Sequence, residues 1–354
     1  MFEGIRRDVR MVVDGLRGRS PSPIVKRGPG AVYGAVAVDS ASRARAVEVV
    51  EVRRETEDAV TLGLGRMEFV AGQFVTVIVE LEGEQLRRAY SISSGVGEPA
   101  TITVKRMGRA SGWLVEHARV GTRLQILGPS GEFTLVPGGA ARHVVGVAGG
   151  SGITPIMGIA RTLLAHEPAS RMTIVYGNRT VEGTIFRDEL ARMERASGGR
   201  LTVQHVIGPV EMEAMDADAY YVCGPEPMMD AVRARLLAGG VARENIKEER
   251  FSAPARRLTS TVSQAQPVTI RRAGVAMDVI VPAGETILDA GLAAGVPMKL
   301  SCAMGGCGAC AVRLLDGEVV MDEPNCLAPA ERARGVILAC VARPATPCTV
   351  ESEP

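Results

Sequence analysis

The sequence is short of aromatic residues and has no surplus of either charge. Aromatic side chains make up 3% of the 354 residues, with a single tryptophan. The core must therefore be built mainly from aliphatic residues and the 15 methionines. Lysine and arginine number 41 against 40 aspartates and glutamates, which excludes a basic field over the whole molecule for binding nucleic acid. No apolar run approaches the ~18–20 residues that cross a bilayer.

The N-terminal segment also lacks the marks of a secretory signal. It has no unbroken apolar stretch and no A-x-A-like cleavage site, so we expect a cytoplasmic protein. Apolar residues recur at helical spacing in this segment, at Phe2, Ile5, Val9, Val12 and Leu16. A basic amphipathic helix over residues 1–20 would either lie on the inner face of the membrane, as a peripheral contact, or pack on its own protein.

The length predicts two or three domains, and a composition of 46% apolar and 23% charged residues excludes wholesale disorder. Changes in pattern along the chain divide it into five parts. We expect an N-terminal extension and linker over 1–41, an antiparallel β-barrel over 42–138, an α/β domain over 139–252, a linker over 253–266 and a cysteine-rich domain over 267–354.

Two contrasting patterns support the two central domains. Between 42 and 138, short alternating segments are separated by turn residues, at 46–53, 59–65, 73–81, 100–107 and 122–128. Such spacing is typical of an antiparallel barrel. From His143 onward, continuous apolar strands alternate with helical segments, which predicts βαβ units around a parallel sheet.

The cysteines are unevenly placed. Six of the seven lie in the last 53 residues, in the pattern Cys302-x4-Cys307-x2-Cys310-x29-Cys340, with Cys326 and Cys348 outside it. This spacing is typical of a plant-type [2Fe–2S] site, and the glycines of SCAMGGCGAC let the backbone wrap closely around a cluster. The alternatives are zinc or a thioredoxin-like pair at Cys307 and Cys310. Zinc sites usually pair two short knuckles, and the sequence has no second knuckle.

A glycine-rich turn, Gly149–Pro155, follows a predicted strand and opens a predicted helix. Such a turn presents backbone N–H groups and a helix N-terminus to a pyrophosphate. Taken alone, the segments RAYS (88–91), KRMGRASGW (105–113) and GPSGEF (128–133) would pass for an ordinary strand and two turns.

Together these segments resemble the ferredoxin–NADP reductase superfamily. The resemblance covers roughly 44–354 and rests on RAYS, GPSGEF, GGSGITP, YGNRT, CGPEPMM and the cysteine pattern, in that order. It is nearest to oxygenase reductase components of the phenylacetyl-CoA epoxidase and ketosteroid hydroxylase types. It implies an FAD-binding barrel, an NAD(P)-binding α/β domain and a β-grasp ferredoxin domain that holds the [2Fe–2S] cluster through Cys302, Cys307, Cys310 and Cys340.

The resemblance also implies the residues of each cofactor site. The expected FAD-binding residues are Arg88, Tyr90, Ser91, Val104, Lys105, Arg106, Gly108, Ser111 and Gly112, the last three in a phosphate-binding loop. The expected nucleotide-binding residues are Gly150, Gly152, Thr154, Pro155, Asn178, Arg179, Cys223, Gly224 and Pro225. Glu249 and Phe251 match the end of the nucleotide domain, where a residue approaches the flavin.

Three of these residues are expected to act directly in catalysis. In the family pattern Tyr90 packs on the isoalloxazine, Ser91 reaches the flavin N5 edge, and Cys223 lies near the nicotinamide without acting as a covalent nucleophile. Arg88 is expected to pair with the FAD pyrophosphate, a contact suited to a guanidinium. The four histidines are interpreted as ordinary residues.

The cofactors predict a path for electrons from NAD(P)H through FAD and the [2Fe–2S] cluster to a partner oxygenase, hydroxylase or desaturase. The alternative is a redox sensor whose cluster state controls binding of a partner. No Asp or Glu ends the strand before Asn178 to bind a ribose 2′-hydroxyl, and Arg179 could pair with a 2′-phosphate. The sequence therefore favours NADPH over NADH, unless Arg179 is simply a solvated surface charge.

Overall fold

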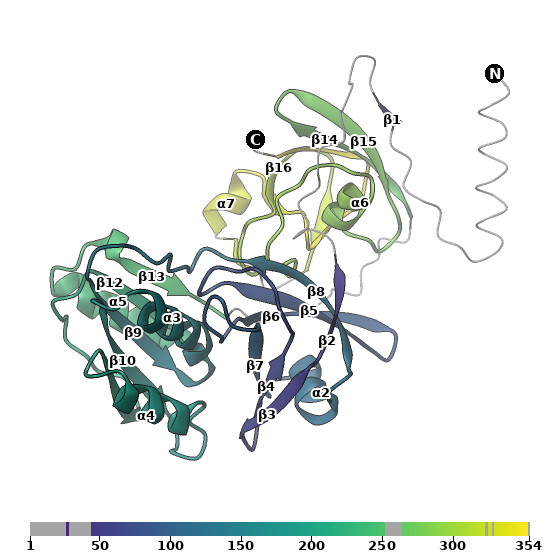
Figure 1. The fold of residues 1–354 in the computed structure, drawn as a ribbon. Coiled ribbons are helices and arrows are strands. Elements are labelled where there is room, and N and C mark those ends of the chain that lie inside the picture. The colour runs from purple at the N-terminus through teal and green to yellow at the C-terminus, as the bar shows by residue number, and fades with distance from the viewer. Residues whose placement is uncertain (1–25, 28–43, 252–263, 323–324, 328, 353–354) are drawn as a thin grey trace, which may run out of the picture. The chain divides into compact units, whose positions relative to one another are not determined.

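The computed structural model describes residues 26–27, 44–251, 264–322, 325–327 and 329–352. The helix expected over residues 1–20 and most of the linker expected over 253–266 lie outside the described residues. The chain divides into two compact units (Figure 1), one spanning 44–251 and the other spanning 264–352 with the short strand β1 (Lys26–Arg27). No helix within the described ranges is long and apolar enough to cross a membrane.

The first part of the larger unit is the predicted antiparallel barrel. Its strands are β2 (Arg45–Glu48), β3 (Glu51–Thr56), β4 (Ala59–Gly63), β5 (Phe74–Leu81), β6 (Glu84–Ser91), β7 (Thr101–Lys105) and β8 (Arg123–Ser130). They form two antiparallel sheets, ordered β2-β8-β5-β6 and β3-β4-β7, with a bridge between Ile92 and Ile102. Aliphatic side chains from both sheets fill the interior, as the low aromatic content requires.

Two local features of the barrel differ from the sequence-based expectation. The segment 46–53 is not one strand, because Val49 N–H donates to Thr122 O on one side and Val50 N–H donates to Gly63 O in the other sheet. The chain changes sheets at this corner. The segment 105–113 is not a turn but leads into helix α2 (Arg109–His117), which buries Ala110, Leu114 and Val115.

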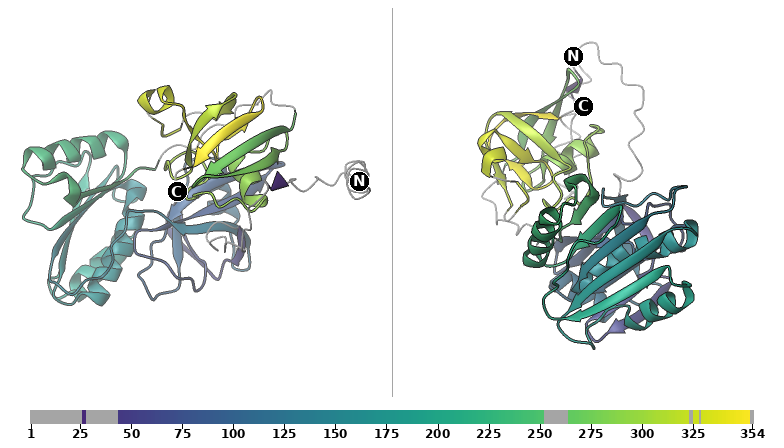
Figure 2. Two further views of the ribbon diagram at one scale, coloured as in Figure 1. Left: turned by 90° about the horizontal axis from the view of Figure 1, so that it is seen from above. Right: turned by 90° about the vertical axis from the view of Figure 1, so that its left-hand side faces the viewer.

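The second part of the larger unit is the predicted α/β domain. Its elements are β9 (His143–Gly149), η2 (Gly150–Gly152), α3 (Ile153–His166), β10 (Arg171–Asn178), α4 (Arg187–Ala196), β11 (Leu201–Ile207), β12 (Ala219–Cys223), α5 (Glu226–Ala238), η3 (Arg243–Asn245) and β13 (Ile246–Glu249). The strands are all parallel in the order β11-β10-β9-β12-β13. Helices α3 and α4 pack on one face and α5 on the other (Figure 2). The strand order reverses between β9 and β12, and ligands of open α/β sheets bind at such a point.

The smaller unit is a β-grasp domain, in which a helix packs on a mixed sheet. Its elements are β14 (Gln266–Arg272), β15 (Val275–Val281), α6 (Ile287–Ala293), β16 (Ala311–Asp316), β17 (Val319–Met321), α7 (Pro329–Ala333), β18 (Val336–Leu338), β19 (Ala342–Pro344) and β20 (Cys348–Ser352). The main sheet has the order β1-β15-β14-β20-β16-β18. Its aliphatic core also contains Cys310, Cys340 and Cys348, so two predicted cluster ligands lie against the core.

Candidate functional site

The end of strand β6 contacts the end of the parallel sheet. Ser91, the last residue of β6, is 2% exposed, and its Oγ donates to Glu249 Oε2 at 3.2 Å. Glu249 ends β13 and lies in register with Cys223, the last residue of β12. A hydroxyl of the barrel thus bonds a carboxyl of the α/β domain, and a thiol lies beside that carboxyl on the neighbouring strand.

Burial determines the protonation of the Glu249 carboxyl and the Cys223 thiol. It raises the pKa of Glu249 to about 7, and the hydrogen bond from Ser91 only partly offsets this effect. Burial also raises the pKa of Cys223 well above its ordinary value, with a further contribution from the negative charge of Glu249. A thiol held neutral in this way is a poor nucleophile, in keeping with the expectation that Cys223 forms no covalent bond.

The other expected FAD-binding residues lie in RAYS and at the end of strand β7. Some have groups that a ligand can contact, and the others are buried or paired within the protein. Tyr90 Oη is buried with no hydrogen-bond partner in the described ranges, and Arg88 has no ion-pair partner there. Arg88 Nη1 donates to Arg87 O at 2.7 Å, so its remaining N–H donors and Tyr90 Oη can contact a ligand. Val104 is 0% exposed in the barrel core, so this position offers a cofactor only its backbone. Lys105 pairs with Asp58 at 3.6 Å and Arg106 pairs with Glu116.

The expected phosphate-binding loop is the first turn of α2. Ser111 Oγ accepts hydrogen bonds from the N–H groups of Met107 at 2.9 Å and Gly108 at 3.0 Å, which satisfies backbone donors that a helix start leaves free. A Cβ added to Gly108 or Gly112 would meet nothing within 4 Å. Ser111 therefore shapes this turn, and the two glycines leave open space beside it.

The two nucleotide-domain turns touch through their backbones. A Cβ on Gly152 would lie 2.1 Å from Cys223 O, and one on Gly149 would lie 2.6 Å from Pro225 Cδ. Neither contact tolerates a side chain, so glycine is required for the turns to meet. Thr154 is 2% exposed and donates to Ser151 O at 3.0 Å, so its hydroxyl supports the turn itself. Gly150, φ +54°, lies in the left-handed region.

The end of β10 lies beside this junction. Tyr176 Oη donates to Gly150 O at 3.0 Å, which ties β10 to the turn. Asn178 is buried, and its Nδ2 has no hydrogen-bond partner in the part of the chain described here. Arg179 is exposed, and Phe251 is 46% exposed; the structure does not bring either one into contact with the Ser91 group.

The predicted cluster ligands lie together in the smaller unit as two interacting pairs of thiols. Hydrogen bonding between Cys302 and Cys307 lowers the pKa of Cys307 and raises that of Cys302. Cys310 and Cys340 interact in the same way. In the described residues, no three metal-binding side chains are arranged around a single ion. Two pairs of thiolates are what a two-iron cluster needs.

Backbone N–H groups of the loop already point at these sulfurs. Gly305 N–H donates to Cys340 Sγ at 3.2 Å and Gly306 N–H to Cys302 Sγ at 3.4 Å. The loop bends through positive φ at Ala303, Gly305 and Gly308. Hydrogen bonds of this kind tune iron–sulfur clusters, so the donor set and the loop fit a [2Fe–2S] group.

Cys326 lies closer to this loop than its spacing indicated. Its N–H donates to Gly305 O at 2.9 Å, and its Sγ is 3.7 Å from the point that a Cβ on Gly308 would occupy. Cys348 is buried in strand β20. Cys326 is therefore a neighbour of the cluster loop, whereas Cys348 belongs to the core.

Comparisons with known proteins assign each domain. Residues 53–135 match an oxidoreductase FAD-binding domain, 147–218 an oxidoreductase NAD-binding domain, and 270–345 a 2Fe-2S iron-sulfur cluster binding domain. The chain is 33% identical over 335 residues to a 1,2-phenylacetyl-CoA epoxidase subunit from Escherichia coli K12, covering 84% of this chain and 94% of that protein.

Two further relatives share this architecture. The ferredoxin reductase component of 3-ketosteroid-9-alpha-monooxygenase from Mycobacterium tuberculosis is also 33% identical, covering 84% of this chain and 92% of the relative. The structure of phthalate dioxygenase reductase superposes with a TM-score of 0.61 at 27% identity, over 87% of this chain and 98% of that chain. The chain belongs to the ferredoxin–NADP reductase superfamily, in the branch with a C-terminal ferredoxin domain.

This reductase therefore uses FAD, a [2Fe–2S] cluster and a pyridine nucleotide, and it passes electrons from NAD(P)H through FAD to the cluster. The side chains fit these groups. The buried, unpartnered Tyr90 Oη and Asn178 Nδ2 lie in the domains that bind FAD and the nucleotide, and the thiol pairs lie in the ferredoxin domain.

The sequence predicts that Glu249 lies at the end of the nucleotide domain but indicates no hydrogen-bond partner for it. Its hydrogen bond to Ser91 joins residues 158 positions apart, so no local pattern could show it. The only local signal was its position at the end of the last strand of the parallel sheet, where ligands of such sheets bind.

We predict that Glu249→Gln removes a pH-dependent loss of stability. A carboxyl with a raised folded-state pKa stabilises the fold fully below its unfolded pKa of about 4.5, and that contribution is lost as pH rises through about 7. The loss is about 3 kcal/mol. The melting temperature of the FAD-containing unit, followed by release of flavin fluorescence, should therefore fall for wild type relative to the variant between pH 5 and 8.

The exposed neighbour Glu244, changed to Gln, is the matched control and should follow the wild-type pH curve. Parallel pH curves for wild type and Glu249→Gln would show that Glu249 is ionised in the same range in the folded and unfolded states, and would contradict this description of the site.

Proposed function

We propose that this reductase supplies electrons to a partner oxygenase, hydroxylase or desaturase. The relatives support an oxygenase in particular, because the Escherichia coli relative is part of an epoxidase and the Mycobacterium tuberculosis relative is a component of a monooxygenase. The observation that carries the proposal is the hydrogen bond from Ser91 of the barrel to Glu249, which lies beside Cys223 at the carboxyl ends of the strands of the nucleotide sheet. A redox sensor has no need of such a junction between a flavin domain and a nucleotide domain.

The proposed roles at this junction follow from burial and charge. FAD, when bound, accepts a hydride from NAD(P)H and gives up electrons singly. Ser91 presents its hydroxyl at the flavin edge and is oriented by Glu249. Cys223, kept neutral by burial, packs beside the nicotinamide, and Tyr90 packs against the flavin ring.

The proposed phosphate contacts use one guanidinium and the backbone N–H groups at the starts of two helices. Arg88, without an ion-pair partner in the described ranges, binds the FAD pyrophosphate. The first turn of α2, in the open space beside Gly108 and Gly112, binds the FAD phosphates through the N–H groups of residues 109–111. Gly150 and Gly152 present the start of α3 to the phosphates of the nucleotide. Phe251 lies close enough in sequence to Glu249 to cover the flavin.

The domain limits predicted from the sequence, at 42–138, 139–252 and 267–354, are part of the proposal, and so is a location in the cytoplasm with peripheral contact through residues 1–20.

The first prediction from the proposed function separates cluster ligands from bystanders. Cys302→Ser, Cys307→Ser, Cys310→Ser and Cys340→Ser should each lose or destabilise the cluster, since each removes one thiolate. Electron transfer to a ferredoxin-type acceptor should fall at least about tenfold, while reduction of ferricyanide by the flavin persists. Absorbance and the paramagnetic signal of the reduced cluster provide the measurement.

Cys326→Ser and Cys348→Ser are the controls. Cys326→Ser is the stricter one because Cys326 lies beside the cluster loop. Bleaching in Cys326→Ser with an intact cluster in Cys340→Ser would reverse the ligand assignment. Loss of ferricyanide reduction in Cys302→Ser that still holds FAD would contradict the order of electron flow.

The second prediction concerns the coenzyme. We propose that Arg179 pairs with the 2′-phosphate of NADPH and that Asn178 binds the neighbouring ribose, since no acidic residue ends β10. A charge-assisted contact is worth roughly 1.5–3 kcal/mol, so Arg179→Ala should lower kcat/KM for NADPH about 10- to 100-fold and leave that for NADH nearly unchanged. Arg171→Ala, an exposed arginine at the other end of β10, is the control. Equal kcat/KM values for the two coenzymes, unaffected by Arg179→Ala, would sink this assignment.

The third prediction concerns residues 1–20. If their basic amphipathic pattern binds an anionic surface, full-length protein should float with phosphatidylserine-containing liposomes, and a variant lacking residues 1–41 should not. Added salt should weaken the association. Equal flotation of both proteins would rule out a membrane role for this segment.

A further inference from the structure

Helix α3 packs directly on residues 92–96 of the barrel, which follow strand β6. A Cβ on Gly158 would lie 2.6 Å from Ile92 O and 3.1 Å from Ser94 O, so helix and segment approach through bare backbone. Thr162 Oγ1 accepts from Val96 N–H at 3.0 Å, and His166 Nε2 donates to Val96 O at 3.1 Å. The helix that begins at the nucleotide turn is thus fixed, along one side, to residues just beyond Ser91.

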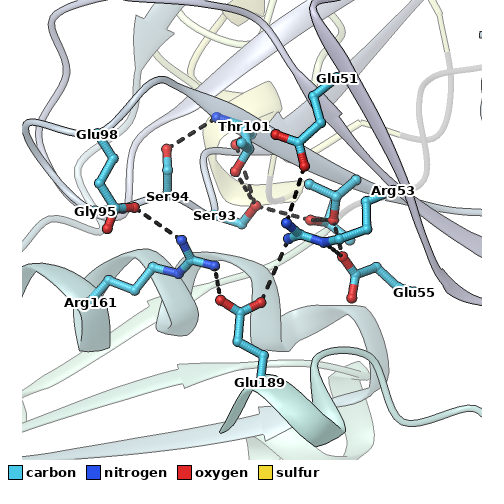
Figure 3. Close-up of polar contacts among 12 residues, drawn as sticks. Glu51, Arg53, Glu55, Ser93, Ser94, Gly95, Glu98, Thr101, Arg161 and Glu189 are labelled. Carbon is cyan, nitrogen blue, oxygen red and sulfur yellow. Dashed lines mark hydrogen bonds and ion pairs between the residues drawn. The ribbon is translucent and has the colours of Figure 1, made fainter. Parts of the chain in front are cut away.

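Arg161 extends this contact to a third element (Figure 3). Its Nη1 donates to Glu98 Oε2 at 3.0 Å, and its Nη2 donates to Glu189 on α4. Glu98 also accepts from Gly95 N–H at 2.8 Å. The side chain of Arg161 is only 18% exposed, and its fork-shaped guanidinium bonds both carboxylates at once, which a lysine could do less well.

Glu189 continues the network back into the barrel. It pairs with Arg53 at 3.6 Å, and Arg53 Nε donates to Glu55 Oε1 at 2.9 Å. Glu55 accepts from the buried hydroxyl of Thr61 at 2.6 Å. Hydroxyl contacts of 2.8 and 2.9 Å then join Thr61 through Thr103 to Ser93. The contacts therefore run from Arg161 through Glu189 and back to Ser93, two residues after Ser91. The backbone from Ser93 to Gly95, whose N–H donates to Glu98, closes the ring.

We propose that Arg161 is a positioning residue for hydride transfer. Its ion pairs, with the close approach at Gly158, lock α3 onto the barrel, so that a nucleotide held at the start of α3 meets the flavin at Ser91. This inference rests on the proposed roles of Ser91 and of the turn at 149–155. It does not depend on the identity of the electron acceptor.

Hydride transfer tolerates little displacement of the reacting atoms, so a fixed contact between α3 and the barrel matters for its rate. Hydride transfer requires the reacting atoms to lie about 3–3.5 Å apart, and a displacement of about 1 Å can slow a reaction about 100-fold. The two reacting groups are held by different domains, so their separation depends on the domain contact. Partly exposed ion pairs add little to stability, but pairs on both sides of Arg161 restrict how α3 can rotate or slide.

The test uses the FAD- and cluster-containing protein under anaerobic conditions. Stopped-flow measurement of flavin bleaching against NADPH concentration separates the limiting rate constant from the Kd of the nucleotide. We expect Arg161→Ala to lower the limiting rate about tenfold and Gly158→Ala about 100-fold, with the Kd changed less than threefold. The limiting rate constant of Arg161→Lys should lie between those of wild type and Arg161→Ala.

A second readout does not depend on turnover. Without nucleotide, amide hydrogen exchange in the segment 92–98 should accelerate at least tenfold in Arg161→Ala, because α3, released from Glu98, no longer holds Thr162 Oγ1 firmly against the Val96 N–H. Arg187→Ala removes an exposed arginine of α4 that pairs only with its neighbour Asp188 in the described ranges, and it should leave both readouts unchanged.

The following outcomes decide whether Arg161 positions the nucleotide. An unchanged limiting rate in Arg161→Ala, or a loss confined to the Kd, overturns the positioning role. If Gly158→Ala fails to fold, the shape-conserving Glu189→Gln replaces it and should slow flavin bleaching in the same way. If Ser91→Ala does not slow bleaching, the proposed flavin edge is wrong; if Ser91→Ala slows it and Arg161→Ala does not, only the positioning role fails.

Discussion

The larger unit depends on the close approach of the barrel and the α/β domain at the end of strand β6. Hydride transfer takes place only between atoms that nearly touch, yet the two cofactors bind to a barrel and to an α/β sheet. Glycine at position 158 makes the approach possible, because a Cβ there would lie 2.6 Å from Ile92 O of the barrel. A side chain at Gly158 would separate the domains where they have to meet, whereas one at Gly152, 2.1 Å from Cys223 O, would separate the two turns of the nucleotide domain.

The ferredoxin domain has to hold its cluster, and one loop supplies most of what this needs. Its cluster loop bends through left-handed residues and directs backbone N–H groups at Cys302 and Cys340. A neutral loop with fixed donors can stabilise the negative charge of thiolates without added cations. The predicted cluster site is thus shaped by one loop together with Cys340, 35 positions beyond Gly305. The hydrogen bond between Ser91 and Glu249, by contrast, joins two domains across 158 positions.

This difference explains what the sequence could and could not predict. The ligand pattern at Cys302–Cys310 and the alternation of strands and helices after His143 are local signals, and both led to the observed architecture. Helix α2 was missed because GRASG contains the small residues of a turn. The proximity of Cys326 to the cluster loop and the contact between Ser91 and Glu249 depend on tertiary packing, which no spacing rule contains.

The order of electron flow is tested most directly by the paramagnetic signal of the reduced cluster in holoprotein and in protein stripped of FAD, each mixed anaerobically with NADPH. If the hydride enters at the Ser91 edge, the holoprotein should bleach its flavin first and then develop the cluster signal. The FAD-free protein, with its cluster intact, should give no signal until FAD is restored. A cluster signal of full size without FAD would contradict electron entry through the flavin.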